Sequence, residues 1–474
     1  MVSHRRKSQS VGFLICYIYK KPIKTISYLF LSMLLLACQE TRKPTTKLTD
    51  PQLDYQAYKP SGSERILSRS EYREKLEGFW LAQCIGNWTG LVTEMDKIGL
   101  ADSLQTGRFY TREDWGGKDL PNIWNDQPSP LSPTIDFVFA AADSVWGADD
   151  DTDIEYLYQH LLYTLQTSVL TGEAIRKGWL SHIKATEENY LWVSNQKAFD
   201  LMQAGMVPPH TGDPLHNPHF EMIDAQLSTE IFGLFAPTRP DFAIKMAQLP
   251  IQTTARFNAQ WIAEFYVRMH ALASMEMPGM NRPQQLFWMA EEARKALPED
   301  SYAAGMYDFV KAQYLLGSPW ESIRDQIYQR YQVAQQDGYD LTAQKRYCNG
   351  CFAAGINFAA SLVSLFCGEG DLKKTIKIGT LAGWDSDNPT ATWAGLLGFM
   401  MGKKGVEQAF GRTFSSRFNI HRTRQHFPKG IDDFSQMSAT GIFVIDRVVQ
   451  EALGGGIDLD SDRWYIPKKT QPPK

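Results

Sequence analysis

The chain has 474 residues, of which 43% are apolar, so it is long enough to bury a large core. Its formal net charge of -4 comes from mixed acidic and basic stretches, without the concentrated basic surface that nucleic-acid binding requires. Composition therefore argues against a nucleic-acid partner and leaves the number of domains open.

The amino terminus has the pattern of an export signal. An apolar run over 26–37 is too short to span a bilayer, and it follows the basic residues Lys20, Lys21 and Lys24. The run ends at Leu35-Leu36-Ala37-Cys38, which resembles the lipobox of bacterial lipoproteins, where the Cys is acylated and becomes the first mature residue. We therefore predict a signal peptide over 1–37 and a lipid anchor at Cys38, on the periplasmic side or the cell surface. The alternative is an ordinary cleaved signal with a chance cysteine.

The polar stretch after Cys38 predicts a flexible tether over 38–65. Residues 66–474 are then predicted to form one helical domain. No segment beyond the amino-terminal region approaches the ~20 apolar residues of a membrane-spanning helix.

Helical periodicity dominates the rest of the chain and predicts an all-α fold. One amphipathic helix runs from Ile154 to Val169. An earlier helix, beginning near Ser70, carries small residues at every fourth position and offers a smooth ridge for close helix packing. The ridge residues are Gly78, Ala82, Gly86 and Gly90. Further helices are predicted over 224–235, 240–247, 254–273, 283–296, 353–367, 372–382, 389–401 and 434–453.

Two aspartate clusters stand immediately before predicted helices. The first, Asp149 to Asp151, precedes the amphipathic helix; the second is Asp385-Ser386-Asp387, with Asn388 as the predicted N-cap. Neighbouring carboxylates repel, and a folded chain tolerates them chiefly when a cation neutralises them. Oxygen-only ligands suit Mg²⁺ or Mn²⁺. The alternative is a pair of solvated acidic helix caps.

A third acidic residue, Glu94, ends the segment 86–94 that continues the small-residue ridge. The three motifs together resemble the ADP-ribosylglycohydrolase family, which includes the dinitrogenase-reductase-activating glycohydrolases. That family has an opening helix G-x3-G-x3-G-D-x2-G-x3-E, then a [ST]-D-D-T helix start, then a late G-G-D-x-D-[TN] turn. The resemblance covers roughly 72–453 and implies a compact orthogonal bundle of helices with a binuclear Mg²⁺ or Mn²⁺ centre.

The resemblance implies roles for individual residues. The implied metal ligands are Asp149, Asp150, Asp151, Asp385, Asp387 and Asn388. Glu94, beside the substrate ribose, and Asp151 are the predicted catalytic residues, with Glu94 as general acid or base. The chain departs from the family pattern at four positions: Asp149 replaces Ser or Thr, Asn388 replaces Thr, Trp384 replaces Gly and Asn87 replaces Asp. These departures leave the metal preference and the exact substrate open.

Other segments are predicted to shape the pocket. The predicted substrate-binding residues are Asn87, Glu94, Gln226, His210 and Trp384. Three histidines of the loop over 207–220 could bind zinc, but a surface loop or substrate contacts are favoured. The basic stretch over 417–429 could meet a pyrophosphate, although a solvated turn is favoured. Cys348 and Cys351 could be redox-active or half of a zinc site; buried structural thiols are favoured.

The resulting hypothesis is a metal-dependent hydrolase that cleaves an N- or O-glycosidic bond to ADP-ribose or a related ribosyl compound, as a monomer with two Mg²⁺ or Mn²⁺ ions. One alternative is a non-catalytic lipoprotein that binds ADP-ribose or a nucleoside and retains the fold. Another is an all-α polysaccharide glycosidase that uses two carboxylates without metals.

Overall fold

The structure is a computed structural model that describes residues 47–99, 106–275, 277–340 and 348–468. Residues 48–474 form one compact unit, and the description concerns this unit. The predicted signal peptide and Cys38 lie outside the described residues. Among the described residues, no helix combines the length and the apolar character needed to cross a bilayer.

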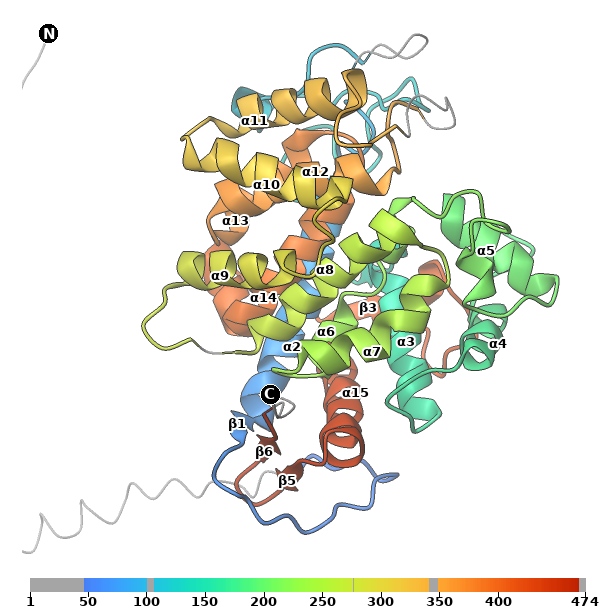
Figure 1. Ribbon diagram of the computed structural model, residues 1–474, viewed down its shortest axis with the longest axis vertical. Helices are drawn as coiled ribbons and strands as arrows, with labels where there is room; N and C mark the ends of the chain where they lie inside the picture. Colours follow the sequence, from blue (N-terminus) through green and yellow to red (C-terminus); the bar gives the residue numbers. More distant parts are fainter. Residues whose placement is uncertain (1–46, 100–105, 276, 341–347, 469–474) are drawn as a thin grey trace, which may run out of the picture. The chain divides into compact units, whose positions relative to one another are not determined.

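The helices account for most of the unit, as predicted (Figure 1). The α-helices are α2 (Arg69–Gly90), α3 (Asp150–Thr164), α4 (Gly172–His182), α5 (Val193–Gln203), α6 (Ile231–Phe235), α7 (Pro240–Gln252), α8 (Phe257–Ala273), α9 (Arg282–Arg294), α10 (Tyr302–Leu315), α11 (Trp320–Ile327), α12 (Ala354–Gly368), α13 (Leu372–Ala382), α14 (Asp387–Phe410) and α15 (Phe434–Arg447). Short 3-10 or π-helical turns are η1 (Arg112–Asp114), η2 (His210–Gly212), η3 (Ile223–Ala225), η4 (Tyr328–Val333), η6 (Ile420–Arg422) and η7 (Val448–Ala452). The all-α prediction is confirmed.

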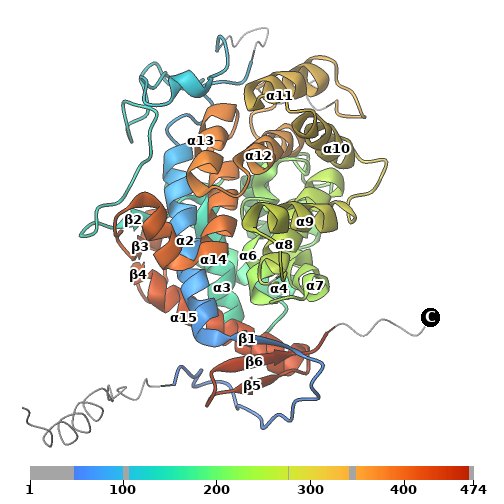
Figure 2. The same ribbon diagram turned by 90° about the vertical axis from the view of Figure 1, so that its left-hand side faces the viewer.

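Two small sheets accompany the helices. One has the order β1-β6-β5 and the other the order β2-β3-β4. Their strands are β1 (Arg65–Ser68), β2 (Trp146–Gly147), β3 (Arg417–Asn419), β4 (Ile431–Asp433), β5 (Gly456–Asp458) and β6 (Arg463–Ile466). The first sheet lies beside the start of α2, where β1 leads directly into the helix (Figure 2). The second joins the chain before α3 to the basic stretch after α14, which brings together segments about 270 residues apart.

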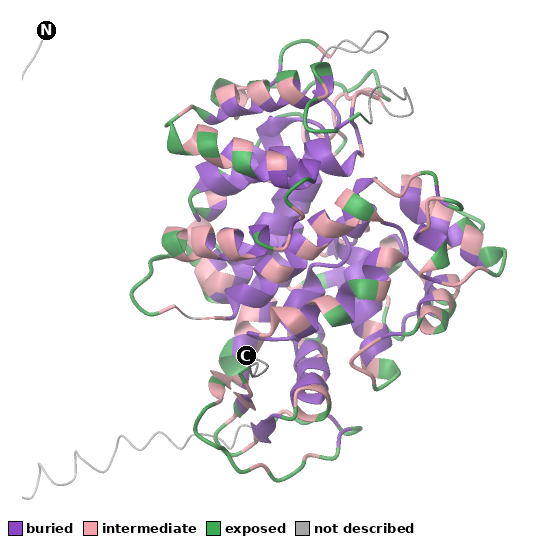
Figure 3. Ribbon diagram, in the orientation of Figure 1, coloured by how far each residue is buried: buried purple, intermediate pink, exposed green. Residues whose placement is uncertain are grey.

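The predicted small-residue ridge on α2 packs against α14, and the two helices lie side by side at the centre of the unit (Figure 2). A Cβ added at Gly86 would lie 2.1 Å from the carbonyl oxygen of Thr390, and one at Gly90 would lie 2.3 Å from the Cα of Asp387. Because nothing larger than hydrogen fits there, the glycines allow main chain to meet main chain. Figure 3 shows α12 and the first half of α14 almost wholly buried.

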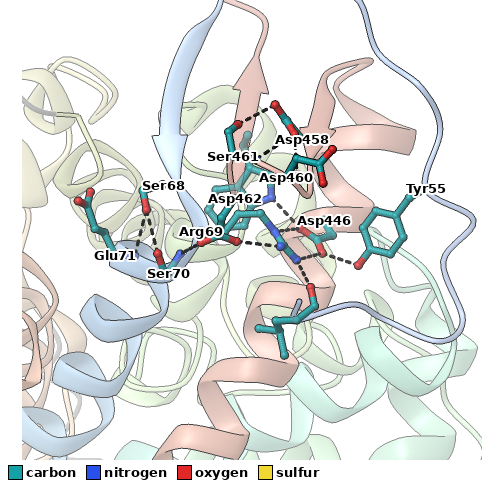
Figure 4. A network of polar contacts seen from close by, with 12 residues as sticks. Tyr55, Ser68, Arg69, Ser70, Glu71, Asp446, Asp458, Asp460, Ser461 and Asp462 are labelled. Carbon is teal, nitrogen blue, oxygen red and sulfur yellow. Dashed lines mark hydrogen bonds and ion pairs between the residues drawn. The ribbon is translucent and has the colours of Figure 1, made fainter. Parts of the chain in front are cut away.

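The amino-terminal part of the unit is clamped by a buried ion pair at the start of α2 (Figure 4). Arg69 donates from Nε and Nη2 to the two oxygens of Asp446 at 3.0 and 2.7 Å. Asp446 also accepts from the hydroxyl of Tyr55 and the indole of Trp464, both at 2.7 Å. The prediction of a flexible tether is therefore wrong from residue 48 onward, because Leu53 is buried and Tyr55 anchors this segment to α15.

A carboxyl pair is enclosed in the core between α2, α3, α6 and α14. Glu155 accepts from Gln83 Nε2 at 2.6 Å and from the backbone N–H of Ile231 at 2.8 Å. Glu230 accepts from the hydroxyl of Thr392 at 2.9 Å, while its second oxygen has no partner among the described residues. Burial raises the pKa of Glu230 to about 7. Burial, followed by repulsion from Glu230, raises the pKa of Glu155 well above its usual range.

The raised pKa of Glu230 predicts a pH-dependent stability. In the unfolded chain a Glu titrates near ~4.3, so the folded state binds a proton more tightly and loses stability as pH rises from there to about 7. Glu230→Gln removes this penalty. We expect the variant to gain melting temperature relative to the wild type at pH 8 and to gain little or nothing at pH 4.5.

The measurement is the difference in melting temperature between variant and wild type across this pH range, with the exposed Glu188→Gln as control. A constant difference at all pH values would show that Glu230 does not titrate between the two limits.

Candidate functional site

The first aspartate cluster forms the start of α3, as predicted. Asp149 is the N-cap residue, and its backbone N–H donates to the Thr152 hydroxyl at 3.0 Å in a capping box. Asp150 and Asp151 follow in the first helical turn. Ala148 donates its N–H to the carbonyl of Asn419, which ties this turn to the end of β3. The negative charges therefore gather at the positive end of a helix.

The second cluster forms the turn between α13 and α14. The N-cap residue is Ser386, so the prediction of Asn388 as N-cap is wrong and Asn388 is the second residue of the helix. The earlier start has a physical reason. The Ser386 hydroxyl donates to the carbonyl of Gly90 at 2.9 Å, and the Ser386 carbonyl accepts from the Thr390 hydroxyl at 2.9 Å. The first turn of α14 is thereby fixed against the end of α2.

The loop after α2 places Glu94 beside this turn. Met95 donates its N–H to the carbonyl of Trp384 at 2.9 Å, and Trp384 donates its own to the carbonyl of Lys97 at 2.8 Å. Between them Gly383 has φ +99° and lies so close to Lys97 that an added Cβ would stand 2.5 Å from its carbonyl oxygen. These backbone bonds fix Glu94 close to the second cluster.

The acidic side chains converge on Asp387. Carboxylate oxygens of Glu94, Asp385 and Asp387 lie within 4.8 Å of one another, and the same holds for Asp149, Asp150 and Asp387. Asp387 therefore belongs to both triads. The site joins residues that are about 290 positions apart in the sequence, and the prediction that the two clusters and Glu94 lie together is supported by this geometry.

Asp151 belongs to neither triad, although its carboxyl interacts with Asp387, and it is held by a chain of amides. Asn388 Nδ2 donates to Asp151 Oδ1 at 3.1 Å, and Gln226 Nε2 donates to Asn388 Oδ1 at 3.2 Å. Both ends of the Asn388 amide are thus engaged, so its observed role is to orient Asp151, and direct metal ligation by Asn388 stays a prediction. Asn87 Nδ2 reaches Asp149 at 3.4 Å and Asp387 at 3.5 Å, which places it between the two triads.

Burial and mutual repulsion govern the charge state of the cluster. Burial, then repulsion from neighbouring aspartates, raises the pKa values of Asp150, Asp151 and Asp385 well above their usual range. Burial, then repulsion from Asp149, raises the pKa of Asp387 to about 7. For Glu94 the pKa is likewise raised well above its usual range, by burial and then by Asp387. In the absence of cations the site therefore favours the protonated form of these carboxyls more than solvent-exposed surroundings would.

The donor set fits hard divalent cations. Both triads consist of carboxylates only, and no triad of potential ligands in the described part of the chain contains a histidine or cysteine. Asp387 Oδ1 and Asn87 Oδ1 are buried without a hydrogen-bond partner among the described residues. Oxygens left unpaired in a buried acidic cluster are what a bound cation would satisfy.

Two of the predicted substrate residues lie elsewhere. The indole of Trp384 is fully buried against Phe109 and Tyr328, so it supports the turn from behind and does not line an accessible pocket. His210 is exposed in η2, which packs on α5 and α7, and it makes no hydrogen bond to the acidic cluster. Gln226 and Asn87, in contrast, contact cluster residues directly.

Several supporting residues were not identified from the sequence. Asn357 accepts from the backbone N–H of Asp385 at 3.2 Å. Its amide nitrogen donates to the carbonyl of Cys351, which forms a disulfide with Cys348 in place of the expected buried thiols. The interpretation of the basic stretch over 417–429 as a solvated turn fits the exposed Arg417 and Lys429 and is wrong for Arg424. Arg424 is fully buried in an ion pair with Asp153 at 2.8 Å.

The number of acidic residues at the start of α3 could have predicted a buried cationic partner such as Arg424. Asp149 to Asp151 and Asp153 place four acidic side chains within one and a half helical turns, and a buried Asp outside the acidic cluster requires a cationic partner. The signal for Asn357 was weaker, because a single Asn inside an apolar helix does not reveal which distant main-chain group it binds.

The chain is similar to known proteins over most of its length. The family model for ADP-ribosylglycohydrolase matches residues 68–427. A solved structure described as an ADP-ribosylglycohydrolase-related protein complex is similar at 13% sequence identity, with 79% of this chain and 98% of that chain covered and a TM-score of 0.42. No curated protein matches the chain. The match of the family model over more than two thirds of the sequence shows that this chain belongs to the ADP-ribosylglycohydrolase family.

Proposed function

We propose that the protein is a metal-dependent glycohydrolase that cleaves an N- or O-glycosidic bond to ADP-ribose or a related ribosyl compound. The observation that carries the proposal is the pair of carboxylate triads that share Asp387, with Glu94 in one of them. Two divalent cations, Mg²⁺ or Mn²⁺, held by Asp149, Asp150, Asp151, Asp385 and Asp387, would supply binding of sugar hydroxyls and activation of water. The chain would act on a small-molecule substrate as a monomer.

Glu94 is the proposed proton carrier. Among the three residues of its triad, Glu94 is the one that is not fully buried, since Asp385 and Asp387 are buried, so we assign the contact with an entering substrate to Glu94. Burial raises the pKa of Glu94 above its usual range, and this direction favours the protonated carboxyl that a general acid needs to protonate the leaving group. After departure of that group the carboxylate can accept a proton from the attacking water. The hydrogen bond from Asn388 would restrict rotation of the Asp151 carboxylate and so keep it oriented for the reaction.

Metal binding should stabilise the fold. A ligand that binds only the folded state adds about 2.7 kcal/mol at a hundredfold excess over its dissociation constant. We expect Mg²⁺ or Mn²⁺ to raise the melting temperature of chelator-treated protein, and Asp385→Ala or Asp387→Ala to abolish both this shift and hydrolysis of ADP-ribosylated peptides.

Asp300→Ala, an exposed aspartate distant in sequence from both clusters, serves as the control and should keep the shift. Metal-independent melting together with normal hydrolysis by both variants would leave the clusters as acidic helix caps. A metal-dependent shift without hydrolysis of any ribosyl compound would favour a binding protein.

Glu94→Gln separates proton transfer from metal binding. The variant keeps an oxygen at the same position but loses the transferable proton, so we expect turnover to fall by about 10²- to 10⁴-fold while the metal-dependent melting shift remains. Turnover and melting are measured on the same preparations. Loss of the melting shift would instead make Glu94 a cation ligand.

We also propose export and a lipid anchor at Cys38, on the basis of Leu35 to Cys38 after the short apolar run. Cys38→Ala should abolish acylation and move the protein from the membrane fraction to the soluble fraction. The measurement is fractionation with metabolic labelling by a fatty acid. An unchanged membrane fraction with no label in the wild type would contradict the anchor.

A further inference from the structure

The basic side chains of the stretch over 417–429 make different contacts. Arg424 forms a buried ion pair with Asp153. Lys429 lies 3.7 Å from Asp432 on the surface. Arg422, at the end of η6, is the one cation of this stretch that reaches the acidic cluster. Its Nη1 donates to the carbonyl of Ala148 at 2.6 Å and to Asp149 Oδ1 at 2.9 Å.

The guanidinium of Arg422 lies over two aromatic rings. Its central carbon lies 5.3 Å from the ring centre of Trp88 and 4.9 Å from that of Tyr190. Gly147 makes room for this packing, because an added Cβ would stand 2.7 Å from the Arg422 side chain and 2.8 Å from the Trp88 ring. Aromatic contacts on a guanidinium attract the cation and restrict its rotation.

The backbone immediately before Tyr190 is bound by the buried Arg424. Arg424 donates to the carbonyl of Asn189, the residue before Tyr190, and Tyr190 has φ +51°. A non-glycine residue in this region of the backbone persists only where its surroundings hold it there. The ion pair of Arg424 with Asp153 therefore supports the placement of Arg422 through Tyr190.

One edge of the Arg422 guanidinium remains without a protein partner. Among the described residues, neither Nε nor Nη2 makes a hydrogen bond, and the side chain is 32% exposed. Elsewhere in the chain the same edge binds both oxygens of a carboxylate. Arg69 holds Asp446 in this way at 3.0 and 2.7 Å, and Arg112 holds Glu321 at 2.7 and 2.6 Å. The free edge of Arg422 is thus equipped for a planar or tetrahedral oxyanion.

We propose that Arg422 is a binding subsite for an anionic substituent of the substrate, a phosphate or a carboxylate carried next to the sugar. The proposal rests on the proposed function, because it takes the sugar to be held at the triads. Nη1 bonds Asp149, whose ligand oxygen lies within 4.8 Å of Asp150 and Asp387. The guanidinium thus lies beside the proposed sugar site, and in this proposal its free edge binds a charged substituent a few bonds from the sugar. Without cations the carboxylates would repel an anion, so its binding should require loaded metal.

The test is calorimetric binding to Mn²⁺-saturated protein, with D-ribose 5-phosphate, D-riburonate and D-ribose as probes. The phosphate and carboxylate probes distinguish the two anion sources. We expect at least one of them to bind about 10- to 100-fold more tightly than ribose, the gain of a charge-assisted bidentate contact. The preference should disappear in Arg422→Gln while ribose binding and the Mn²⁺-dependent melting shift remain.

Two further variants control the result. Arg417→Gln removes an exposed arginine of the same stretch and should keep the full preference. Arg422→Lys keeps a positive charge near Asp149 but lacks the two-pronged edge, so its preference should be reduced even where Arg422→Gln is poorly folded.

Each outcome decides the proposal. A preference for either anion that persists in Arg422→Gln, or ribose binding without any preference in the wild type, overturns the subsite and leaves the proposed function standing. Failure of Mn²⁺-saturated wild type to bind any of the three sugars overturns the proposed function and the subsite with it.

Discussion

The contact between α2 and α14 is the constraint from which the site follows. Helices with ordinary side chains pack with axes about 8–10 Å apart. At Gly86 and Gly90 the main chain of α2 meets the main chain of Thr390 and the Cα of Asp387 directly. Because the start of α14 is pressed against the end of α2, the residues that follow Gly90 have to turn past Asp387. Glu94 reaches Asp387 by this route, and a larger residue at either glycine would separate them.

Helix dipoles alone do not account for the acidic cluster. Two helix N-termini point at it, and each offers about 0.3–1 kcal/mol to a nearby anion. A single unit of pKa shift already corresponds to about 1.4 kcal/mol, and the pKa values of Asp150, Asp151 and Asp385 are raised well beyond their usual range. The helix ends are therefore too weak to hold this many charges, and protons or cations have to complete the balance.

Local patterns in the sequence predicted much of the fold and the acidic residues of the site. The helix over 372–382 was predicted with its observed bounds, and the ridge on α2 was identified from its glycines. Predictions failed where the deciding partner is far away in sequence. The predicted helix over 224–235 is instead a 3-10 turn followed by α6, and the first residue of α6, Ile231, donates its backbone N–H to Glu155 on α3. Helices α4, α5, α10 and α11 were not identified, and α11 has only eight residues.

The pairing of Asp149 with Arg422 bears on how many cations the site would hold. Asp149 adds a carboxylate to the four aspartates at positions 150, 151, 385 and 387, and Arg422 adds the one cation that contacts them among the described residues. Together they carry a net charge of minus four when Glu94 keeps its proton. One divalent cation would leave two negative charges in a largely buried cluster, where an unpaired charge costs several kcal/mol. Two divalent cations restore neutrality, so the arginine makes a fifth aspartate compatible with a binuclear centre.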